Sequence, residues 1–463
     1  PRRLDKKKRG FQLPHVIIIL MCIMLAVTVM SFLIPSGEFV RDANGAVDPT
    51  QFSYVENDNP ITFFDFFYDI PHGIVESADI IISIMVISGV LYVIEQTVAI
   101  SAALQRLTAA ARGKEVFVVL GLTLVFGVLG VIGWGEDALP FVPMVVSLAL
   151  ALGYDRVVGV AIVQLGVCIG FSTGAFNTFT TGICQELAGV PIFTAWQFRL
   201  MEFVICYLIL ALFLASYCRK IKRDPNRSVM PEFQRGERQE QKLMTEQVPM
   251  TPRRVLTLLA FVVALIVQVF GAIQLGWGME QFSGLYVILA VAVAVINGIS
   301  PSKACTDFIQ GTTTVMSAVI VIGVARAIYL LMDQAKIVDT IIHALANVFE
   351  GKSPFVVLLL LYIFVIVFNF FVTSASGKAF ILFPMLKPLA DILGINQQVV
   401  VTTFQLGDGF TNWFFPSSGL LMAGLELGGV TYQQWVKFAA KIIGALVLAG
   451  LCFAFLAQMI GLS

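Results

Sequence analysis

One polar stretch interrupts an apolar run near the C-terminal end of the chain. Residues 405–419 hold an acid, two amides, three hydroxyls, a proline and three glycines between apolar runs at 399–404 and 420–425. In hydrocarbon every unpaired backbone group costs several kcal/mol, so such an interruption is tolerated only where it lines a protein-enclosed cavity. An ionisable side chain at membrane depth indicates function by default. The stretch predicts a substrate or ion site in an unwound membrane helix, with candidate ligands Asp408, Thr411, Asn412, Ser417 and Ser418.

A second polar interruption lies inside the apolar run at residues 157–190. Its hydroxyls and amide offer neutral oxygen ligands, which suit Na⁺ or a hydrogen-bonded solute. A single Ser or Thr in a helix usually bonds to its own backbone carbonyls. The clustering of several such residues nevertheless favours a site, with candidates Ser172, Thr173, Asn177, Thr178, Thr180 and Thr181.

Two pairs of short apolar runs predict re-entrant hairpins at residues 116–152 and 355–393. The first hairpin has Glu136 and Asp137 at its tip. One acid at a helix N-terminus is worth about 0.3–1 kcal/mol as a cap, but a pair exceeds what capping needs. We expect at least one of them to bind a cationic part of the substrate or to carry a coupling proton.

The tip of the second hairpin contains Ser376, Gly377 and Lys378. Its small residues suit a tight turn and a helix N-terminus that can face an anion. Two roles for Lys378 stay open, a contact with a substrate carboxylate or an extension toward the membrane surface.

The composition identifies the class of protein. Of 463 residues, 58% are apolar and 13% are charged, whereas a soluble domain averages about 25% charged residues. We therefore predict an all-α polytopic membrane protein in a bacterial inner membrane, with about nine full spans, the two hairpins and two broken helices. The basic residues at positions 2–9 place the N-terminus in the cytoplasm, and the span count places the C-terminus outside.

Other patterns exclude several classes of function. The net charge is zero and the seven cysteines lie mostly in apolar runs, which predicts neither nucleic-acid binding nor disulfides. The sequence has no Walker loop, His-Glu-x-x-His or Gly-x-Ser-x-Gly motif. We expect a protein that is not an enzyme and that needs no cofactor beyond a coupling ion.

The two halves of the chain resemble each other. Gln164-Leu-Gly166 matches Gln405-Leu-Gly407 at a separation of 405 − 164 = 241 residues, and the two hairpin tips coincide at the same separation. The predicted organisation is a basic N-terminus at 1–13, a first repeat at 14–218, a cytoplasmic linker at 219–254, and an extra span plus an inverted second repeat at 255–463. Matched broken helices, here 157–190 and 398–428, point to the midplane site of a secondary transporter rather than to a channel.

Leu152-Gly-Tyr-Asp155, Gln405-Leu-Gly-Asp-Gly-Phe-Thr-Asn412 and Pro416-Ser-Ser-Gly419 resemble the YfcC/DcuC-type carriers of the ion transporter superfamily. The resemblance covers nearly the whole chain. It implies a homodimer in which a transport domain moves like an elevator against a scaffold domain. Members carry four-carbon dicarboxylates or exchange arginine and ornithine. Both hairpins depart from the superfamily's sodium-binding Ser-Asn-Thr tip, so the coupling ion can be H⁺ or Na⁺. A Na⁺ site would lie near Gly135, Thr173, Ser374 and Asn412.

Charge decides which substrate we expect. The candidate site has three acids, Glu136, Asp137 and Asp408, against the single cation Lys378. We therefore predict a secondary carrier or exchanger for a small carboxylate-bearing solute, a basic amino acid such as arginine or ornithine. The alternative is a four-carbon dicarboxylate carrier coupled to Na⁺ or H⁺, and more distant alternatives are a channel or a non-transport receptor.

Overall fold

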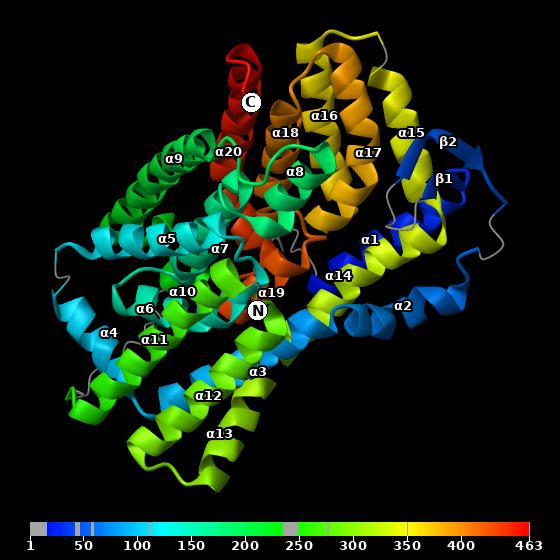
Figure 1. Ribbon diagram of the computed structural model, residues 1–463. Helices are drawn as coiled ribbons and strands as arrows, with labels where there is room; N and C mark the ends of the chain where they lie inside the picture. Colours follow the sequence, from blue (N-terminus) through cyan, green and yellow to red (C-terminus); the bar gives the residue numbers. More distant parts are fainter. Residues whose placement is uncertain are drawn as a thin grey trace, which may run out of the picture.

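The apolar runs of the sequence form helices (Figure 1). The structure is a computed structural model that describes residues 16–41, 47–56, 60–110, 113–234, 249–275, 277–349 and 351–462. Within these ranges six helices are long and apolar enough to cross a membrane. The predicted total of nine spans stays a prediction, because several apolar helices are shorter. The six are α3 (Ala78–Gln96), α7 (Arg156–Thr173), α9 (Trp196–Arg223), α12 (Met279–Asn297), α14 (Met316–Gln334) and α20 (Tyr432–Met459).

The expectation of an all-α chain is wrong in one detail. Strand β1 (Gly37–Arg41) pairs antiparallel with β2 (Val47–Tyr54). This β-hairpin is stabilised by tertiary contacts, which the local sequence pattern does not predict. The Phe39 amide donates to Asp339 Oδ2 at 3.0 Å, and the ring of Phe52 stacks on His343 at a centroid distance of 4.0 Å.

Two groups of helices can be followed in Figure 1. In one group α2 (Phe63–Glu76) packs along α14, and α13 (Pro301–Thr313) packs along α3, so each short helix crosses to the other half of the chain. Helices α1 (Val16–Ser31) and α12 complete this group beside α14 and α3. The remaining helices outside the second group are α4 (Ala99–Ala110), α10 (Pro231–Gln234), α11 (Pro252–Leu275) and α15 (Ile337–Phe349).

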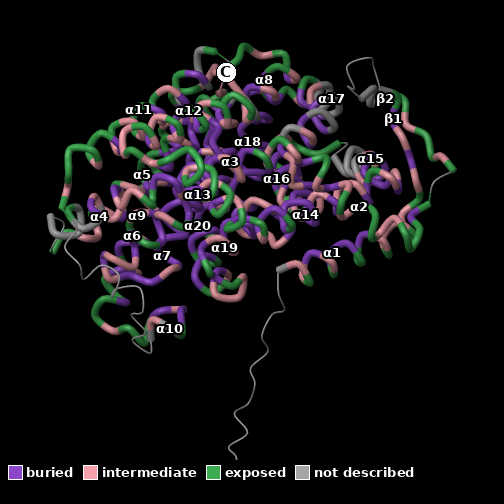
Figure 2. Tube along the Cα trace, turned by 90° about the horizontal axis from the view of Figure 1, so that it is seen from below, coloured by how far each residue is buried: buried purple, intermediate pink, exposed green. Residues whose placement is uncertain are grey.

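The second group contains the predicted re-entrant hairpins and the predicted broken helices. The segment predicted as the first hairpin is α5 (Glu115–Val131), a 3₁₀ turn (Glu136–Phe141) and α6 (Val142–Ala151); the second is α16 (Pro354–Asn369) and α17 (Ala375–Leu393). Helix α5 packs on α7, and α16 packs on α18 (Gln397–Gly409). The second arms cross over, since α6 packs on α19 (Gly419–Gly428) and α17 on α8 (Ile183–Ala188). Helices α7 and α18 are buried along almost their whole length, and Figure 2 shows buried residues in the interior of the molecule.

Both long polar interruptions are breaks between helices. Helix α7 ends at Gly174, whose left-handed φ of +55° suits glycine, and a π-helical turn (Thr178–Gly182) precedes α8. In the second half a 3₁₀ turn (Phe410–Trp413) follows α18, and irregular residues 414–418 lead into α19. We call residues 174–177 the first break and residues 414–418 the second break.

The start of the predicted linker is anchored to the beginning of α7. Asp155 Oδ2 accepts hydrogen bonds from Tyr217 Oη at 2.7 Å and from Ser228 Oγ at 2.6 Å. Burial raises the pKa of the Asp155 carboxyl above its ordinary value, although the Ser228 and Tyr217 bonds oppose this rise. The predicted N-terminal segment 1–13 and linker residues 235–248 lie outside the described residues.

Candidate functional site

A cavity of about 520 Å³ lies where the two helix groups meet. Both hairpin tips contribute to its wall, together with residues next to both breaks and residues of α2, α3, α12 and α14. Its volume falls within the range of about 300–1,000 Å³ that is usual for small-molecule sites. The polar and charged residues that line it are Glu76, Ser77, Asp79, Glu136, Asp137, Thr180, Arg326, Thr373, Ser374, Asn412 and Ser418.

The cavity has more acidic than basic side chains. Arg326 Nη2 lies 3.6 Å from Glu76 Oε2, so these two charges compensate each other. Three further acids line the wall, namely Asp79, Glu136 and Asp137. The predicted pair at the first hairpin tip therefore faces the cavity, and a third acid, Asp79, joins it from α3.

Several polar atoms at the cavity have no hydrogen-bond partner within the described part of the chain. They are Asp137 Oδ1, Thr180 Oγ1, Arg326 Nε and Trp413 Nε1. Asp137 is only 6% exposed, and an unsatisfied buried polar group costs about 1–3 kcal/mol. Such groups need an explanation, and a ligand that supplies the missing partners is one.

Two helix N-termini also face the cavity. Ser374 precedes α17 and its Oγ accepts from Gly377 N at 3.2 Å, while Ser418 precedes α19 and its Oγ accepts from Leu421 N at 3.3 Å. Both serines line the wall. The first turns of helices present backbone N–H groups and partial positive charge, so these ends can hold a carboxylate.

Lys378 does not line the cavity. Its side chain is fully buried, and its Nζ donates hydrogen bonds to Asp408 Oδ1 and to Asn369 Oδ1. The structure shows neither of the two roles predicted for Lys378, because a buried ammonium needs an ionic partner and Asp408 provides it. The same pairing uses Asp408, which we expected to contact the substrate.

Asn369, the last residue of α16, completes this cluster and was missed from the sequence. Its Nδ2 lies 2.8 Å from Thr411 Oγ1, 3.0 Å from the Asp408 carbonyl and 3.1 Å from Asn412 Oδ1. Asn412 also lines the cavity, and its Nδ2 lies 3.4 Å from Asp408 Oδ2. The signal that could have found Asn369 is an amide at the end of an otherwise apolar run, just before the second tip.

Residues 13–459 match the family model of the C4-dicarboxylate anaerobic carriers, DcuC. The chain belongs to the DcuC family. It is 30% identical over 82% of its length, and 78% of the relative's, to the Escherichia coli K12 protein named "Putative basic amino acid antiporter YfcC". It is also 28% identical to an uncharacterized Haemophilus influenzae protein, over 96% of this chain and 97% of that one. The resemblance inferred from the sequence is confirmed, and the chain is a membrane transporter.

Two solved transporter structures are distantly similar to this DcuC-family chain. Neisseria gonorrhoeae MtrF, from "a Class of Antimetabolite Efflux Pumps", gives a TM-score of 0.47 at 15% identity over 96% of this chain and 95% of that one. The Alcanivorax borkumensis YdaH transporter gives 0.43 at 13% identity over 97% and 99%. Scores of this size add no argument about fold or mechanism.

Two of the hydroxyls near the first break of this DcuC-family chain bond to their own helix, whereas Thr180 Oγ1 and Thr181 Oγ1 have no hydrogen-bond partner within the described residues. Ser172 Oγ donates to the Cys168 carbonyl at 2.6 Å, and Thr173 Oγ1 donates to the Ile169 carbonyl at 2.9 Å. Asn177 Oδ1 accepts from Thr180 N at 3.2 Å. Of the four residues predicted around Na⁺, Ser374 and Asn412 line the cavity. The side chains of Thr178 and Ser376 lie outside the described residues, and buried Ser417 Oγ has no partner within them.

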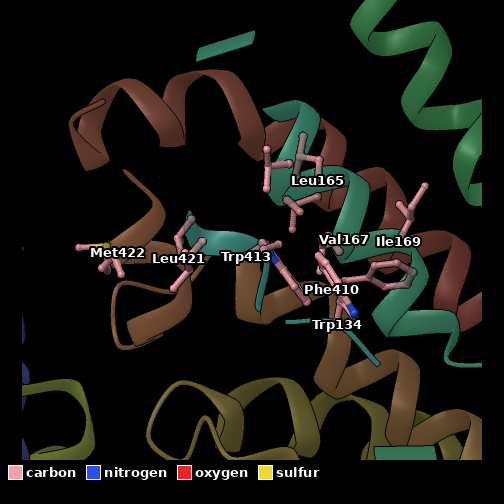
Figure 3. Close-up of a cluster of buried hydrophobic side chains, with 14 of the residues drawn as sticks. Trp134, Leu165, Val167, Ile169, Phe410, Trp413, Leu421 and Met422 are labelled. Carbon is pink, nitrogen blue, oxygen red and sulfur yellow. The ribbon is translucent and has the colours of Figure 1, made fainter. Parts of the chain in front are cut away.

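Two equivalent glutamines connect the halves of the chain next to the site. Gln164 Nε2 donates to the Leu420 carbonyl at 3.3 Å, and Gln405 Nε2 donates to the Phe171 carbonyl at 2.7 Å. Phe171 and Trp413 line the cavity with their ring centroids 5.5 Å apart. Trp413 also belongs to the apolar cluster of Figure 3. The other members labelled there are residues of α7 and α19 together with Trp134 and Phe410.

Proposed function

We propose that the chain is a secondary active carrier or exchanger of a basic amino acid, such as arginine or ornithine, and that the 520 Å³ cavity is its binding site. The observation that supports this choice is the excess of acids in the cavity wall. Asp79, Glu136 and Asp137 remain after Arg326 and Glu76 compensate each other.

The wall offers separate partners for the two ends of such a molecule. The α-carboxylate fits the N-termini of α17 and α19, with Arg326 Nε as a further donor. The cationic side chain fits Asp137 and Glu136 at the first tip, where Asp137 Oδ1 is the atom that gains a partner. Charge-assisted hydrogen bonds of this kind contribute about 1.5–3 kcal/mol each.

A four-carbon dicarboxylate is the second candidate, and the description of the family favours it. One of its carboxylates has the same helix ends available. The other would face Asp79, Glu136 and Asp137, and like charges at short range repel unless the acids take up protons. The E. coli relative, whose name specifies a basic amino acid, supports the first candidate.

We further propose an elevator-type mechanism in a homodimer. The hairpin tips, the broken helices, α9 and α20 would form the moving transport domain, and α1, α2, α3, α12, α13 and α14 the scaffold. The crossed packing of α2 on α14 and of α13 on α3 is what two inverted repeats would produce. Repeat boundaries at 14–218 and 255–463, re-entrant hairpins, a cytoplasmic N-terminus, an outside C-terminus and a bacterial inner membrane belong to the same proposal.

Ligand-dependent thermal unfolding of the purified full-length chain tests the substrate. A ligand at one hundred times its Kd stabilises the folded state by about 2.7 kcal/mol. We expect arginine and ornithine to raise Tm, whereas fumarate and succinate leave it unchanged. Glu136→Gln should reduce the arginine shift, and the control Glu186→Gln, an exposed carboxylate on α8, should retain it.

The opposite pattern, a shift with fumarate or succinate and none with arginine, would make the chain a dicarboxylate carrier. Proteoliposome flux separates the remaining alternatives. A channel would show conductance that does not saturate with substrate, and a receptor would show no flux. Running the assay with and without Na⁺ and a pH gradient identifies the coupling ion.

A further inference from the structure

A second pair of buried charges lies away from the cavity, in the first turns of α9. Arg199 and Glu202 are three residues apart on one face of the helix, and both are 0% exposed. Arg199 Nε and Nη1 and both carboxylate oxygens of Glu202 have no hydrogen-bond partner within the described residues. A fully buried carboxylate that accepts no hydrogen bond is poorly supported as an ion. The arrangement therefore suits a neutral, protonated Glu202.

Among the described residues, Arg199 makes a hydrogen bond that leads away from Glu202. Arg199 Nη2 donates to Gln398 Oε1 at 3.5 Å, and Gln185 Nε2 donates to the same oxygen at 3.2 Å. Gln398 and Gln185 in turn bond to Thr194 in the loop before α9. The guanidinium thus belongs to a network that joins α8 and α18, the two helices that follow and precede the breaks.

The corresponding place in the second repeat is apolar. Gly189-Val190 matches Gly429-Val430 at a separation of 429 − 189 = 240 residues, and α9 and α20 are both 28 residues long. At this separation Arg199 corresponds to Ala439 and Glu202 to Ile442, which are 0% and 2% exposed. Since α20 occupies its equivalent place with apolar side chains, the architecture alone does not demand a buried charge pair on α9. Apolar replacements of such pairs are often neutral or stabilising.

We propose that Glu202 is a proton-binding site of the transport cycle and that Arg199 is its positioning partner. When Glu202 takes a proton from water, its carboxyl becomes neutral and Arg199, which is always cationic, is held by Gln398. When Glu202 returns the proton to water, its carboxylate attracts Arg199 away from Gln398. Proton exchange thereby alters the link between α8 and α18. The proposal rests on the transporter function and not on the identity of the substrate.

The groups that surround the pair keep this exchange specific. The charge that acts on Glu202 is that of Arg199. The thiol of Cys206 on α9 and the phenol of Tyr362 on α16 also lie within electrostatic range of Glu202, but thiols and phenols are neutral near pH 7. Cys184 on α8 lies within electrostatic range of Arg199 and of the Lys378–Asp408 pair. The proton site is therefore adjacent to the cluster behind the second tip.

Infrared difference spectroscopy of the purified full-length chain tests the site without any substrate. Titration from mildly acidic to mildly alkaline pH should remove a protonated-carboxyl band in the wild type. The band should be missing in Glu202→Gln and in the double variant Arg199→Ala/Glu202→Ile, which reproduces the apolar character of α20 and guards against misfolding of the single variant. The control Glu186→Gln should keep it. Other buried acids, such as Asp155, can add bands of their own, so a difference spectrum that is the same in the wild type and in both Glu202 variants would overturn the proposal.

Proteoliposome uptake of arginine under a pH gradient tests the coupling. One unit of pH difference can sustain about a tenfold accumulation of a solute exchanged for one proton. We expect the wild type and Glu186→Gln to accumulate arginine and both Glu202 variants to lose the accumulation. Accumulation by those variants at the wild-type level would overturn the coupling role. If the wild type moves no arginine, the substrate proposal fails, and the infrared result still decides the proton site.

Discussion

The tips of the two predicted hairpins, which the proposed repeat makes equivalent, hold charges in opposite environments. Asp137 at the first tip corresponds to Lys378 at the second, since 378 − 137 = 241. Asp137 lines the cavity with one oxygen unpaired, whereas Lys378 is enclosed by Asp408 and Asn369. The charge of Asp137 is available to a ligand, whereas the charge of Lys378 is paired inside the protein.

Under the proposed repeat, one tip would bind the substrate and its counterpart would hold helices together. A buried charge whose partners are all supplied by the chain stabilises one arrangement of helices. A charge that lacks a partner costs free energy until a ligand arrives. The second tip can meet the substrate through backbone groups of α17, because its only cation is already paired.

The largest effect is expected from Lys378→Met. Removing one member of a buried ion pair leaves Asp408 uncompensated and should cost about 3–5 kcal/mol of unfolding free energy. The change should appear as a lower Tm and a lower yield of folded protein. Asp137→Asn, the equivalent change at the first tip, should not lower Tm and should raise it slightly when no ligand is present, because it removes a buried charge that has no partner within the described residues.

The double variant Lys378→Met/Asp408→Leu is the control for this interpretation. It should recover much of the lost stability, because no unpaired charge remains. A double variant as unstable as Lys378→Met would mean that the two residues act independently.

The next effect is on binding. Asp137→Asn keeps the shape of the side chain and removes its charge, so a charge-assisted hydrogen bond worth about 1.5–3 kcal/mol is weakened and the Kd for arginine should rise roughly ten- to a hundredfold. Titration calorimetry or a thermal-shift titration measures this change. An unchanged Kd would mean that Asp137 does not bind the substrate. The two tips would then differ in how their charges are paired but not in substrate binding.

The sequence predicted the helices, both breaks and the acids at the first tip, because glycines and polar residues inside apolar runs are local signals. It could not predict that Lys378 and Asp408 neutralise each other. Charge counting treats each ionisable residue as free, and their pairing depends on how α17 packs against α18. Asp79 and Arg326 escaped notice for the same reason, since they reach the cavity from α3 and α14, which have no polar interruption of this kind.

A further difference between the halves concerns backbone packing. A Cβ on Gly166 would lie 2.8 Å from the Thr123 carbonyl, whereas a Cβ on the equivalent Gly407 would meet Tyr362 and Val365 at 3.3 Å. Overpacking costs about 1–3 kcal/mol, so Gly166→Ala should destabilise clearly and Gly407→Ala much less. Thermal unfolding of the two variants side by side is the measurement. Equal losses would show that the hairpins pack alike against α7 and α18.

The smallest effect is expected from the helix caps. Ser374 and Ser418 each accept one backbone hydrogen bond at the start of a helix that faces the cavity, and replacing a cap by Ala costs about 1 kcal/mol. Ser374→Ala and Ser418→Ala should therefore lower Tm slightly and by similar amounts. If only one helix end holds the substrate carboxylate, the two variants should differ in their Kd for arginine. Arginine methyl ester lacks a free carboxylate, so it should then bind the affected variant and the wild type equally. If the ester still distinguishes the variant from the wild type, the cap supports the cavity wall and the carboxylate lies elsewhere.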